Sequence, residues 1–281
     1  MHAIEVHELR KSYDGLEAVR GISFEIRSGE VFGLLGPNGA GKTTTVEILE
    51  GYRRPDSGKA TVLGLDPRLA GPGWRERIGV VPQSGELFPN LTVKEHLELF
   101  AGYYAKPSPP ADVLSLVGLE HKRDAKTRTL SGGQKRRLDL GIALVGDPEL
   151  LFLDEPTTGF DPGARRAAWE TIRSMRSLGK TILLTTHYIE EAQRLADRVA
   201  VMRRGEIVAA GTPAELTSAA PASRISFRRN GSEVVIETEE PTRVLHELTD
   251  EALREGLELE ALEVHRPTLE DVYLSLTEAE E

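Results

Sequence analysis

The chain has 281 residues, of which 39% are hydrophobic and 28% are charged, a composition typical of a globular protein with one large domain or one domain plus an appendage. Its net charge of −10 and its lack of cysteine argue against a basic nucleic-acid-binding surface and exclude disulfides and thiolate metal sites, and a reducing cytoplasm is the natural setting. No apolar run approaches the roughly 18 residues that cross a membrane, and no signal-peptide pattern opens the chain, so we expect no membrane span.

The first part of the chain alternates short apolar runs with turns. Strands are predicted at residues 4–9, 22–26 and 31–35. The dipeptides Asp14-Gly15 and Ser28-Gly29 separate these strands, and a helix begins at Thr43. The third strand is therefore predicted to lead through a short loop into a helix.

The middle of the chain changes to a helical pattern and then returns to apolar runs. Residues 91–145 show apolar side chains at helical spacing, interrupted by the breaker Lys106–Pro110. Strands are predicted again at 150–153, 181–185 and 198–202. This rhythm indicates an α/β core with a mostly parallel sheet, interrupted by a helical insert at about 87–145.

A second, smaller unit is predicted after residue 216. Residues 217–223 have small side chains typical of a linker. Beyond them, the dipeptide Asn230-Gly231 is a strong hairpin signal between two predicted strands. The predicted elements of this unit are strands at 224–228 and 233–237, a helix at 242–255, a strand at 257–264 and a helix at 268–277. Residues 224–281 are therefore expected to form a small α+β domain.

The negative charge belongs mainly to that unit. Residues 232–281 contain 16 Asp and Glu against 3 Arg, a balance of −13, which leaves 32 minus 29, or +3, for residues 1–231. An anionic membrane surface would repel such a tail. A well-solvated acidic face is the simplest interpretation of this charge.

The first chemical motif follows the strand at 31–35 and precedes a helix. It reads Gly36, Pro37, Asn38, Gly39, Ala40, Gly41, Lys42, Thr43. This is the P-loop pattern in its required context, where glycines let successive N–H groups point inward and a helix N-terminus helps to hold polyphosphate. We expect Lys42 to reach the β- and γ-phosphates, Thr43 to bind Mg²⁺ and Thr44 to add a phosphate contact.

The second motif is an apolar strand, residues 150–153, that ends in Asp154 and Glu155. Ligands of parallel sheets bind at the carboxyl ends of strands, so these carboxylates are expected near phosphate and metal. Asp154 is predicted to hold Mg²⁺, partly through water, and Glu155 to orient and polarise the attacking water.

A third motif separates this chain from other P-loop proteins. Residues 130–134 read Leu-Ser-Gly-Gly-Gln and are followed by a basic run, Lys135 to Arg137. Ser131 with two glycines at a helix start forms a second anion-binding helix N-terminus. With this motif, the chain closely resembles the ATP-binding cassette family, whose signature is LSGGQ, over residues 1 to about 216. The resemblance implies a RecA-like parallel sheet with an antiparallel β subdomain and the helical insert.

The resemblance implies how the motifs share their work. In the family, the signature of one subunit covers the nucleotide on the partner's P-loop, which gives the second cradle its purpose. The residues expected to meet the γ-phosphate across that interface are Ser131, Gly132 and Gly133, and Gln134 is expected to belong to the same nucleotide-binding site. Tyr13 matches the aromatic side chain that stacks on adenine. Asp161 matches the D-loop aspartate and is expected to act across the interface. Phe160 stands where this branch of the family usually has Leu, so the resemblance does not define how Asp161 packs.

Two further matches concern the hydrolytic step. Gln83 matches the Q-loop glutamine that touches Mg²⁺ and the water and reports to the permease. His187 follows an apolar strand and matches the switch histidine that contacts the γ-phosphate. With these residues, the resemblance implies an ATPase that uses ATP and Mg²⁺ and works as a dimer with a second copy or a paralogous cassette.

The same resemblance implies a membrane partner. In the family, permease subunits dock beside the Q-loop and helical insert, here near residues 83–99, and this docking places the chain at the cytoplasmic face of the membrane. Leu87 and Phe88 are candidates to receive a permease helix, but a core role fits them equally well. The segment from Pro267 to Thr277 resembles the end of cassettes from type-2 exporters, a drug- and polysaccharide-efflux group that includes daunorubicin-resistance ATPases, although packing alone also predicts such an amphipathic helix.

The leading hypothesis is therefore the ATPase subunit of an exporter of drugs, lipids or polysaccharide, whose tail assists dimerisation or regulation. The alternative is a soluble ABC ATPase without a transport role. The ribosome-acting type usually has two cassettes, and the DNA-repair type has a long coiled coil, whereas only 88 residues lie between Lys42 and Ser131. A nucleotide-binding pseudo-enzyme is disfavoured because Lys42, Asp154, Glu155 and His187 are all present.

Overall fold

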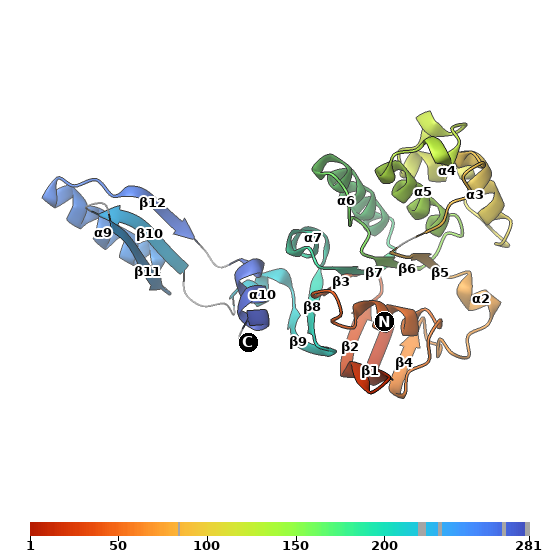
Figure 1. Ribbon diagram of the computed structural model, residues 1–281, viewed down its shortest axis with the longest axis horizontal. Coiled ribbons are helices and arrows are strands. Elements are labelled where there is room, and N and C mark those ends of the chain that lie inside the picture. Colours follow the sequence, from red (N-terminus) through yellow and green to blue (C-terminus); the bar gives the residue numbers. More distant parts are fainter. Residues whose placement is uncertain (84, 219–222, 230–231, 266–267, 279–281) are drawn as a thin grey trace. The chain divides into compact units, whose positions relative to one another are not determined.

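The computed structural model describes the chain except residues 84, 219–222, 230–231, 266–267 and 279–281 (Figure 1). The described part divides into two compact units, Met1–Ala210 and Gly211–Glu281. Within it, no helix combines the length and the apolar character needed to cross a membrane.

A six-stranded sheet forms the centre of the first unit. Its spatial order is β5 (Ile78–Val81), β6 (Leu150–Asp154), β7 (Thr181–Thr186), β3 (Val31–Leu35), β8 (Arg198–Arg203) and β9 (Glu206–Gly211). The pairs from β5 to β8 are parallel. Every residue of β3, β6 and β7 is buried, which explains why these strands are continuous apolar runs instead of alternating ones.

Two hydrophobic cores cover the two faces of this sheet. On β6, Leu151 and Leu153 belong to one core, while Leu150 and Phe152 belong to the other. This alternation follows from the period of two along a strand. The parallel sheet and its two covered faces confirm the predicted α/β P-loop fold.

An antiparallel sheet packs on one of these cores. Its order is β2 (Leu16–Arg27), β1 (His2–Tyr13) and β4 (Ser57–Val62). Asp14 and Gly15 have φ values of 47° and 86°, as a two-residue hairpin turn between β1 and β2 requires. Both strands are longer than the apolar pattern predicts, because their outer residues are exposed but still paired.

Helices complete the first unit. They are α1 (Lys42–Leu49), α2 (Pro72–Arg75), α3 (Val93–Ala101), α4 (Pro110–Leu116), the 3₁₀ turns η1 (Glu120–Lys122) and η2 (Thr127–Thr129), α5 (Gly132–Leu144), α6 (Pro162–Ser177) and α7 (Ile189–Leu195). Figure 1 shows α3, α4 and α5 gathered into one cluster. Leu97, Val113 and Leu138 pack there in the same core as Leu151 and Leu153 of β6, so the helices of the predicted insert share one core with the sheet.

The second unit contains a three-stranded antiparallel sheet. Its order is β11 (Ser232–Thr238), β10 (Ser223–Arg229) and β12 (Glu260–His265). The helices of this unit are α8 (Pro213–Ser218), α9 (Pro241–Glu255) and α10 (Leu269–Glu278). Helix α9 contacts β10, and α10 contacts α8.

Two details of this unit differ from the predicted elements. Residues 217 and 218 end α8 instead of belonging to the linker. Strand β12 starts at Glu260, three residues later than predicted, because Gly256 closes α9 in the left-handed region with φ 65° and an irregular stretch follows. The predicted turn at Asn230-Gly231 lies outside the described residues.

Candidate functional site

The loop from β3 to α1 is shaped by glycines that no other residue can replace. Gly41 caps α1 with φ 100°, and a Cβ atom there would lie 2.2 Å from the carbonyl oxygen of Ala18. A Cβ on Gly36 would lie 2.3 Å from the carbonyl oxygen of Met202. The backbone is thereby forced into a tight curl at a helix N-terminus, which is the geometry that binds phosphate.

The other loop residues divide between core and surface. Ala40 is buried, Thr44 is partly buried, and the tip is exposed. The tip residues are Pro37, Asn38 and Gly39.

Lys42 turns back over this loop. Its Nζ donates to the carbonyl oxygens of Gly36 at 2.8 Å and Pro37 at 3.1 Å and lies 3.5 Å from Glu155 Oε1. The side chain is only 4% exposed, and its burial lowers the pKa of Lys42 although the neighbouring Glu155 charge opposes this effect. The loop therefore holds a desolvated cation at its mouth, where phosphate oxygens would find strong pairing.

Two of the three predicted metal ligands, Thr43 and Asp154, lie beside the loop, and the third, Gln83, contacts Glu155. Thr43 Oγ1 donates to Asp154 Oδ2 at 3.2 Å, and Thr185 Oγ1 donates to Asp154 Oδ1 at 2.5 Å. Among the described residues, no cluster of three or more His, Cys, Asp or Glu side chains is present. One carboxylate and one hydroxyl, completed by water and phosphate oxygens, is a donor set that fits Mg²⁺.

Glu155 contacts several of the other site residues. Its backbone has φ 47°, a strained value, and its N–H donates to Thr185 Oγ1 at 3.0 Å. Its Oε2 accepts from Gln83 Nε2 at 3.2 Å and Thr158 Oγ1 at 3.1 Å, and its Oε1 lies 3.3 Å from His187 Nδ1. The structure thus brings together three predicted residues that are 72 and 32 positions apart in the sequence.

The charge on Glu155 follows from these neighbours. Burial by itself would raise its pKa, but the nearby His187 ring, the charge of Lys42 and the hydrogen bond from Thr158 outweigh that effect and hold the pKa below its usual value. Glu155 is therefore an ionised acceptor near the phosphate loop. An ionised carboxylate in this position can orient a water molecule and polarise it.

The signature motif lies on a different surface. Ser131 caps α5, and its side chain and that of Gln134 each accept a hydrogen bond from the other's backbone N–H. A hollow of about 240 Å³ is lined by residues 131–134 and by Gly159, Phe160 and Asp161. No P-loop residue lines this hollow, so an anion held there would not share the P-loop of the same chain.

Asp161 has a local role in that hollow. Its Oδ1 accepts from the backbone N–H groups of Gly163 and Ala164, both at 2.9 Å, and caps α6. This cap explains the residue type at the position. Its predicted role across a dimer interface stays a prediction.

Tyr13 lies at the end of β1 with cations near its ring. Lys11 Nζ and Arg53 Cζ lie 5.4 Å and 5.5 Å from the ring centroid. These cations are attracted to the ring face, and the predicted stacking of Tyr13 on adenine stays a prediction.

Three residues of the site are not predicted from the sequence. Thr185 joins Asp154 to Glu155, but it lies inside an apolar strand and carries the signal of a core residue. Thr158 follows Glu155 by three positions and was indistinguishable from a loop threonine. Arg136 is recognisable in the sequence only as part of a basic helix start, although it donates to backbone carbonyls of two segments of the site.

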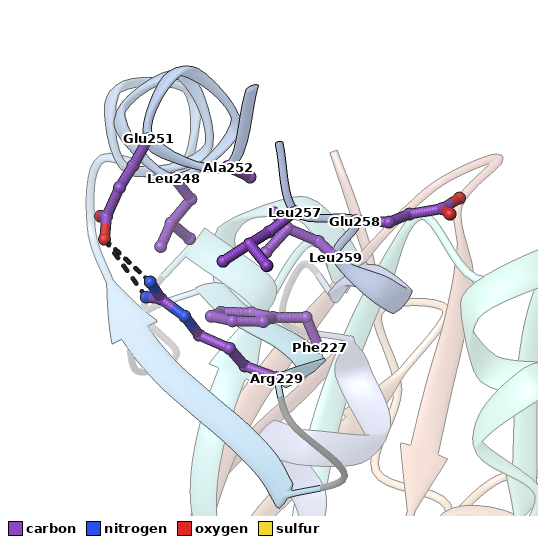
Figure 2. Close-up of a pocket in the computed structure, with 8 residues that line it drawn as sticks. All are labelled: Phe227, Arg229, Leu248, Glu251, Ala252, Leu257, Glu258 and Leu259. Carbon is purple, nitrogen blue, oxygen red and sulfur yellow. Dashed lines mark hydrogen bonds and ion pairs between the residues drawn. The ribbon is translucent and has the colours of Figure 1, made fainter. Parts of the chain in front are cut away.

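The second unit has a cavity that does not resemble a ligand site. It lies between α9 and the sheet and has a volume of about 30 Å³, the size of one water molecule (Figure 2). Arg229 points toward Glu251, with a nitrogen–oxygen distance of 3.2 Å, and also pairs with Glu255. The cation is already neutralised, so this cavity is a packing gap.

Known proteins resemble this chain along most of its length. A model of the family described as ABC transporter matches residues 19–158. The Nod factor export ATP-binding protein I of Burkholderia pseudomallei (strain 1710b) is 48% identical over 221 residues, which cover 77% of this chain and 73% of the relative. The protein of the same description from Rhizobium sp. (strain N33) is 41% identical over 300 residues, which cover 98% and 97% of the two chains.

Solved structures agree with this relationship. The cbiO1 protein of Clostridium perfringens, part of the ABC transporter complex cbiONQ, has a TM-score of 0.70 and 33% identity over 78% of this chain and 91% of its own. The ATP-binding cassette MJ0796, solved as a dimer in a post-hydrolysis state with ADP and Pi, has a TM-score of 0.67 and 25% identity over 74% and 98%. This chain belongs to the ABC transporter family, as an ATP-binding subunit that hydrolyses ATP.

Proposed function

We propose that two copies of this chain enclose two Mg-ATP molecules at composite sites and drive a separate membrane permease of an exporter. The observation that carries this proposal is the separation of two anion cradles in one chain. The P-loop lies with Asp154 and Glu155, whereas the signature lines another hollow with the D-loop. In the dimer, the signature motif of one subunit completes the phosphate site at the P-loop of the other subunit.

The residues of one site divide the hydrolytic work. The loop N–H groups and Lys42 bind the phosphate chain, and the oxygens of Thr43 and Asp154 hold Mg²⁺, which supplies charge neutralisation when it is bound. Glu155 orients the attacking water and accepts its proton. Gln83 and His187 contact Glu155 in the structure, and we assign them to the water and to the γ-phosphate.

ATP in this scheme acts as a reversible link between two subunits. Each bound nucleotide contacts both copies, so binding favours the closed dimer and hydrolysis releases it. The type-2-like tail and the relatives described as Nod factor export proteins support export over import. We assign the cargo to the class of drugs, lipids or polysaccharides, which the permease and not this chain would contact.

The permease is assigned to the surface near residues 83–99. Leu87 is partly buried against the helical core, whereas Phe88 is 53% exposed, so the two candidates have different roles. The Phe88 backbone N–H donates to His96 Nε2 at 2.9 Å, and its carbonyl accepts from Thr127 Oγ1 at 2.6 Å. A rigidly anchored backbone that presents an apolar ring is a favourable docking point.

The Glu155→Gln variant tests the composite-site model. Glutamine keeps the shape of the side chain but cannot accept the proton, so ATP affinity stays within about threefold of wild type while turnover falls about 100-fold or more. The variant is expected to accumulate as a dimer with two ATP molecules. Size-exclusion chromatography with light scattering at saturating Mg-ATP measures this.

The matched control is the Glu155→Gln chain that also carries Lys42→Ala. Loss of the Lys42 cation weakens phosphate binding, and the dimer should disappear at the same ATP concentration. A Glu155→Gln chain that stays monomeric with ATP bound contradicts the composite-site model. Dimer formation that survives Lys42→Ala shows that the contact is not made through nucleotide.

A further inference from the structure

One arginine of the signature helix reaches into the hydrolytic site of its own chain. Arg136 lies on α5, five residues after Ser131, and is only 8% exposed. Its side chain crosses from the helical subdomain to the end of β6 and to the Q-loop. A buried guanidinium requires hydrogen-bond acceptors for its N–H groups.

Its acceptors are backbone carbonyls from two separate segments. Nη1 donates to Pro82 at 2.5 Å. Nη2 donates to Asp154 at 2.8 Å and Glu155 at 3.4 Å, and Nε donates to Pro156 at 3.2 Å. The planar fork of an arginine can hold both segments at once, whereas the single nitrogen of a lysine cannot fix them in the same geometry.

These carbonyls belong to residues that position the chemistry. Pro82 immediately precedes Gln83, and the carbonyls at the end of β6 belong to Asp154, the assigned metal ligand, to Glu155, the assigned water-activating residue, and to Pro156. Glu155 is held at a positive φ of 47°, a conformation that persists only where the surroundings enforce it. Thr185 restrains the N–H of Glu155, and Arg136 restrains its carbonyl.

Arg136 is separated from the surface that receives the partner's nucleotide. The hollow beside the signature is lined by Arg137, the next residue, and not by Arg136. The two neighbouring arginines therefore point to different surfaces of α5. Arg137 belongs to the signature hollow, and Arg136 to the interior of its own chain.

We propose that Arg136 is a positioning residue that couples the signature helix to Gln83 and Glu155 of the same chain. Engagement of the signature with the nucleotide on a second copy would then set the hydrolytic geometry of this chain's own site. The inference rests on the proposed composite-site dimer. It adds a path by which the two sites of the dimer communicate.

A heterodimer that distinguishes the two sites tests the coupling. One differently tagged copy carries Glu155→Gln, so only the site with the intact Glu155 can hydrolyse ATP. Arg136→Lys is placed either on the copy with intact Glu155 (cis) or on the Glu155→Gln copy (trans). The rate of the first ADP formed per dimer is measured, which requires no recycling of the dimer.

The proposal predicts loss of rate in cis only. Misplacement of Glu155 and Gln83 in cis lowers the single-turnover rate by about 10- to 100-fold, while the trans placement changes it by less than about twofold. ATP affinity and dimer yield stay within about twofold of the parent in both, because Arg136 contacts neither the P-loop nor the signature hollow. A merely structural role would lower dimer yield and affinity together.

Controls separate this inference from the proposed function. Arg123→Lys makes the same change at an exposed arginine of the helical subdomain, and it should leave the rate unchanged in both placements. A loss in trans that equals or exceeds the loss in cis, or no loss in either, overturns the coupling while the dimer model stands. A parent pair that forms no ATP-dependent dimer contradicts the proposed function itself.

Discussion

At the scale of single residues, the first unit contains carboxyl groups in opposite electrostatic situations. Glu155 is kept ionised by Lys42 and its hydrogen-bonding neighbours, whereas Glu50, at the end of α1, is pushed toward its neutral form. Burial, then the charges of Asp154 and Glu47, raise the pKa of Glu50 from 4.5 to about 8. An acid whose pKa is higher in the folded chain binds its proton more tightly when folded, so its contribution to stability falls as pH rises from about 4.5 toward 8.

Glu50→Gln should remove this loss. The glutamine cannot ionise, so the variant gains stability relative to wild type as the pH increases, by about 3 kcal/mol between pH 5 and pH 8. Urea unfolding at the two pH values, without nucleotide or Mg²⁺, measures the difference. The same substitution at the exposed Glu170 of α6 is the control, and an equal stability difference between Glu50→Gln and wild type at both pH values would refute the raised pKa.

At the scale of elements, the segment between β5 and α3 joins the site to a surface. Gln83 contacts Glu155 near the start of this segment, and Phe88, five residues later, is exposed. The capping box of Thr92 and Glu95 at the start of α3 fixes the far end. Gln83 and Phe88 are five positions apart in the sequence, so we propose that the position of a docked permease helix at Phe88 affects Gln83.

Phe88→Asp should separate docking from hydrolysis. A charge at the centre of an apolar contact loses more than about 2 kcal/mol of binding free energy, so co-purification with the permease should fall at least about tenfold. ATP hydrolysis by the free subunit should stay within about twofold of wild type. Leu178→Asp, at another exposed leucine, is the control, and permease binding that is equally sensitive to both changes would exclude a docking role for residues 83–99.

At the scale of the whole molecule, the two units differ sharply in charge. Residues 1–210 carry 29 basic and 28 acidic side chains, a balance of +1, and residues 211–281 carry 6 and 17, a balance of −11. We therefore expect the net charge of the second unit to dominate any long-range repulsion between two copies of the chain. Salt screens such repulsion over roughly 10 Å at 0.1 M.

ATP-driven dimerisation should strengthen when salt is raised. In the Glu155→Gln background, an increase from about 50 to 300 mM salt should tighten the dimer by about two- to tenfold. A chain with five exposed glutamates replaced by glutamine should dimerise more tightly at low salt and respond less. The five are Glu233, Glu239, Glu247, Glu260 and Glu270. Analytical ultracentrifugation checks this, and a dimer that weakens with salt would show that the tail pairs with a basic surface of the other copy.

Local motifs were predictable because their physics is local. The curl at Gly36 and Gly41, the cap at Ser131 and the fully buried run of β6 each depend on residues that are neighbours in sequence, so the residue types by themselves indicate the geometry. Strands β4, β5 and β9 are not predicted from the sequence, because no strong local pattern marks them. Ser57–Val62 has few apolar residues, Ile78–Val81 is only four residues long, and Glu206–Gly211 lies at the sheet edge without a fully buried residue, so pairing with neighbouring strands stabilises these segments.

The sequence by itself therefore determined the nucleotide chemistry: a phosphate loop, an acidic strand end and a second anion cradle, each specified by a short run of residues. Only the tertiary structure decided which side chains meet. Parallel strands β6 and β7 end at one edge of the sheet, which brings Glu155, Thr185 and His187 together across gaps of about 30 residues. The reach of Arg136 from α5 to two other segments depends on how the helical subdomain packs against the sheet, and no local pattern encodes such packing.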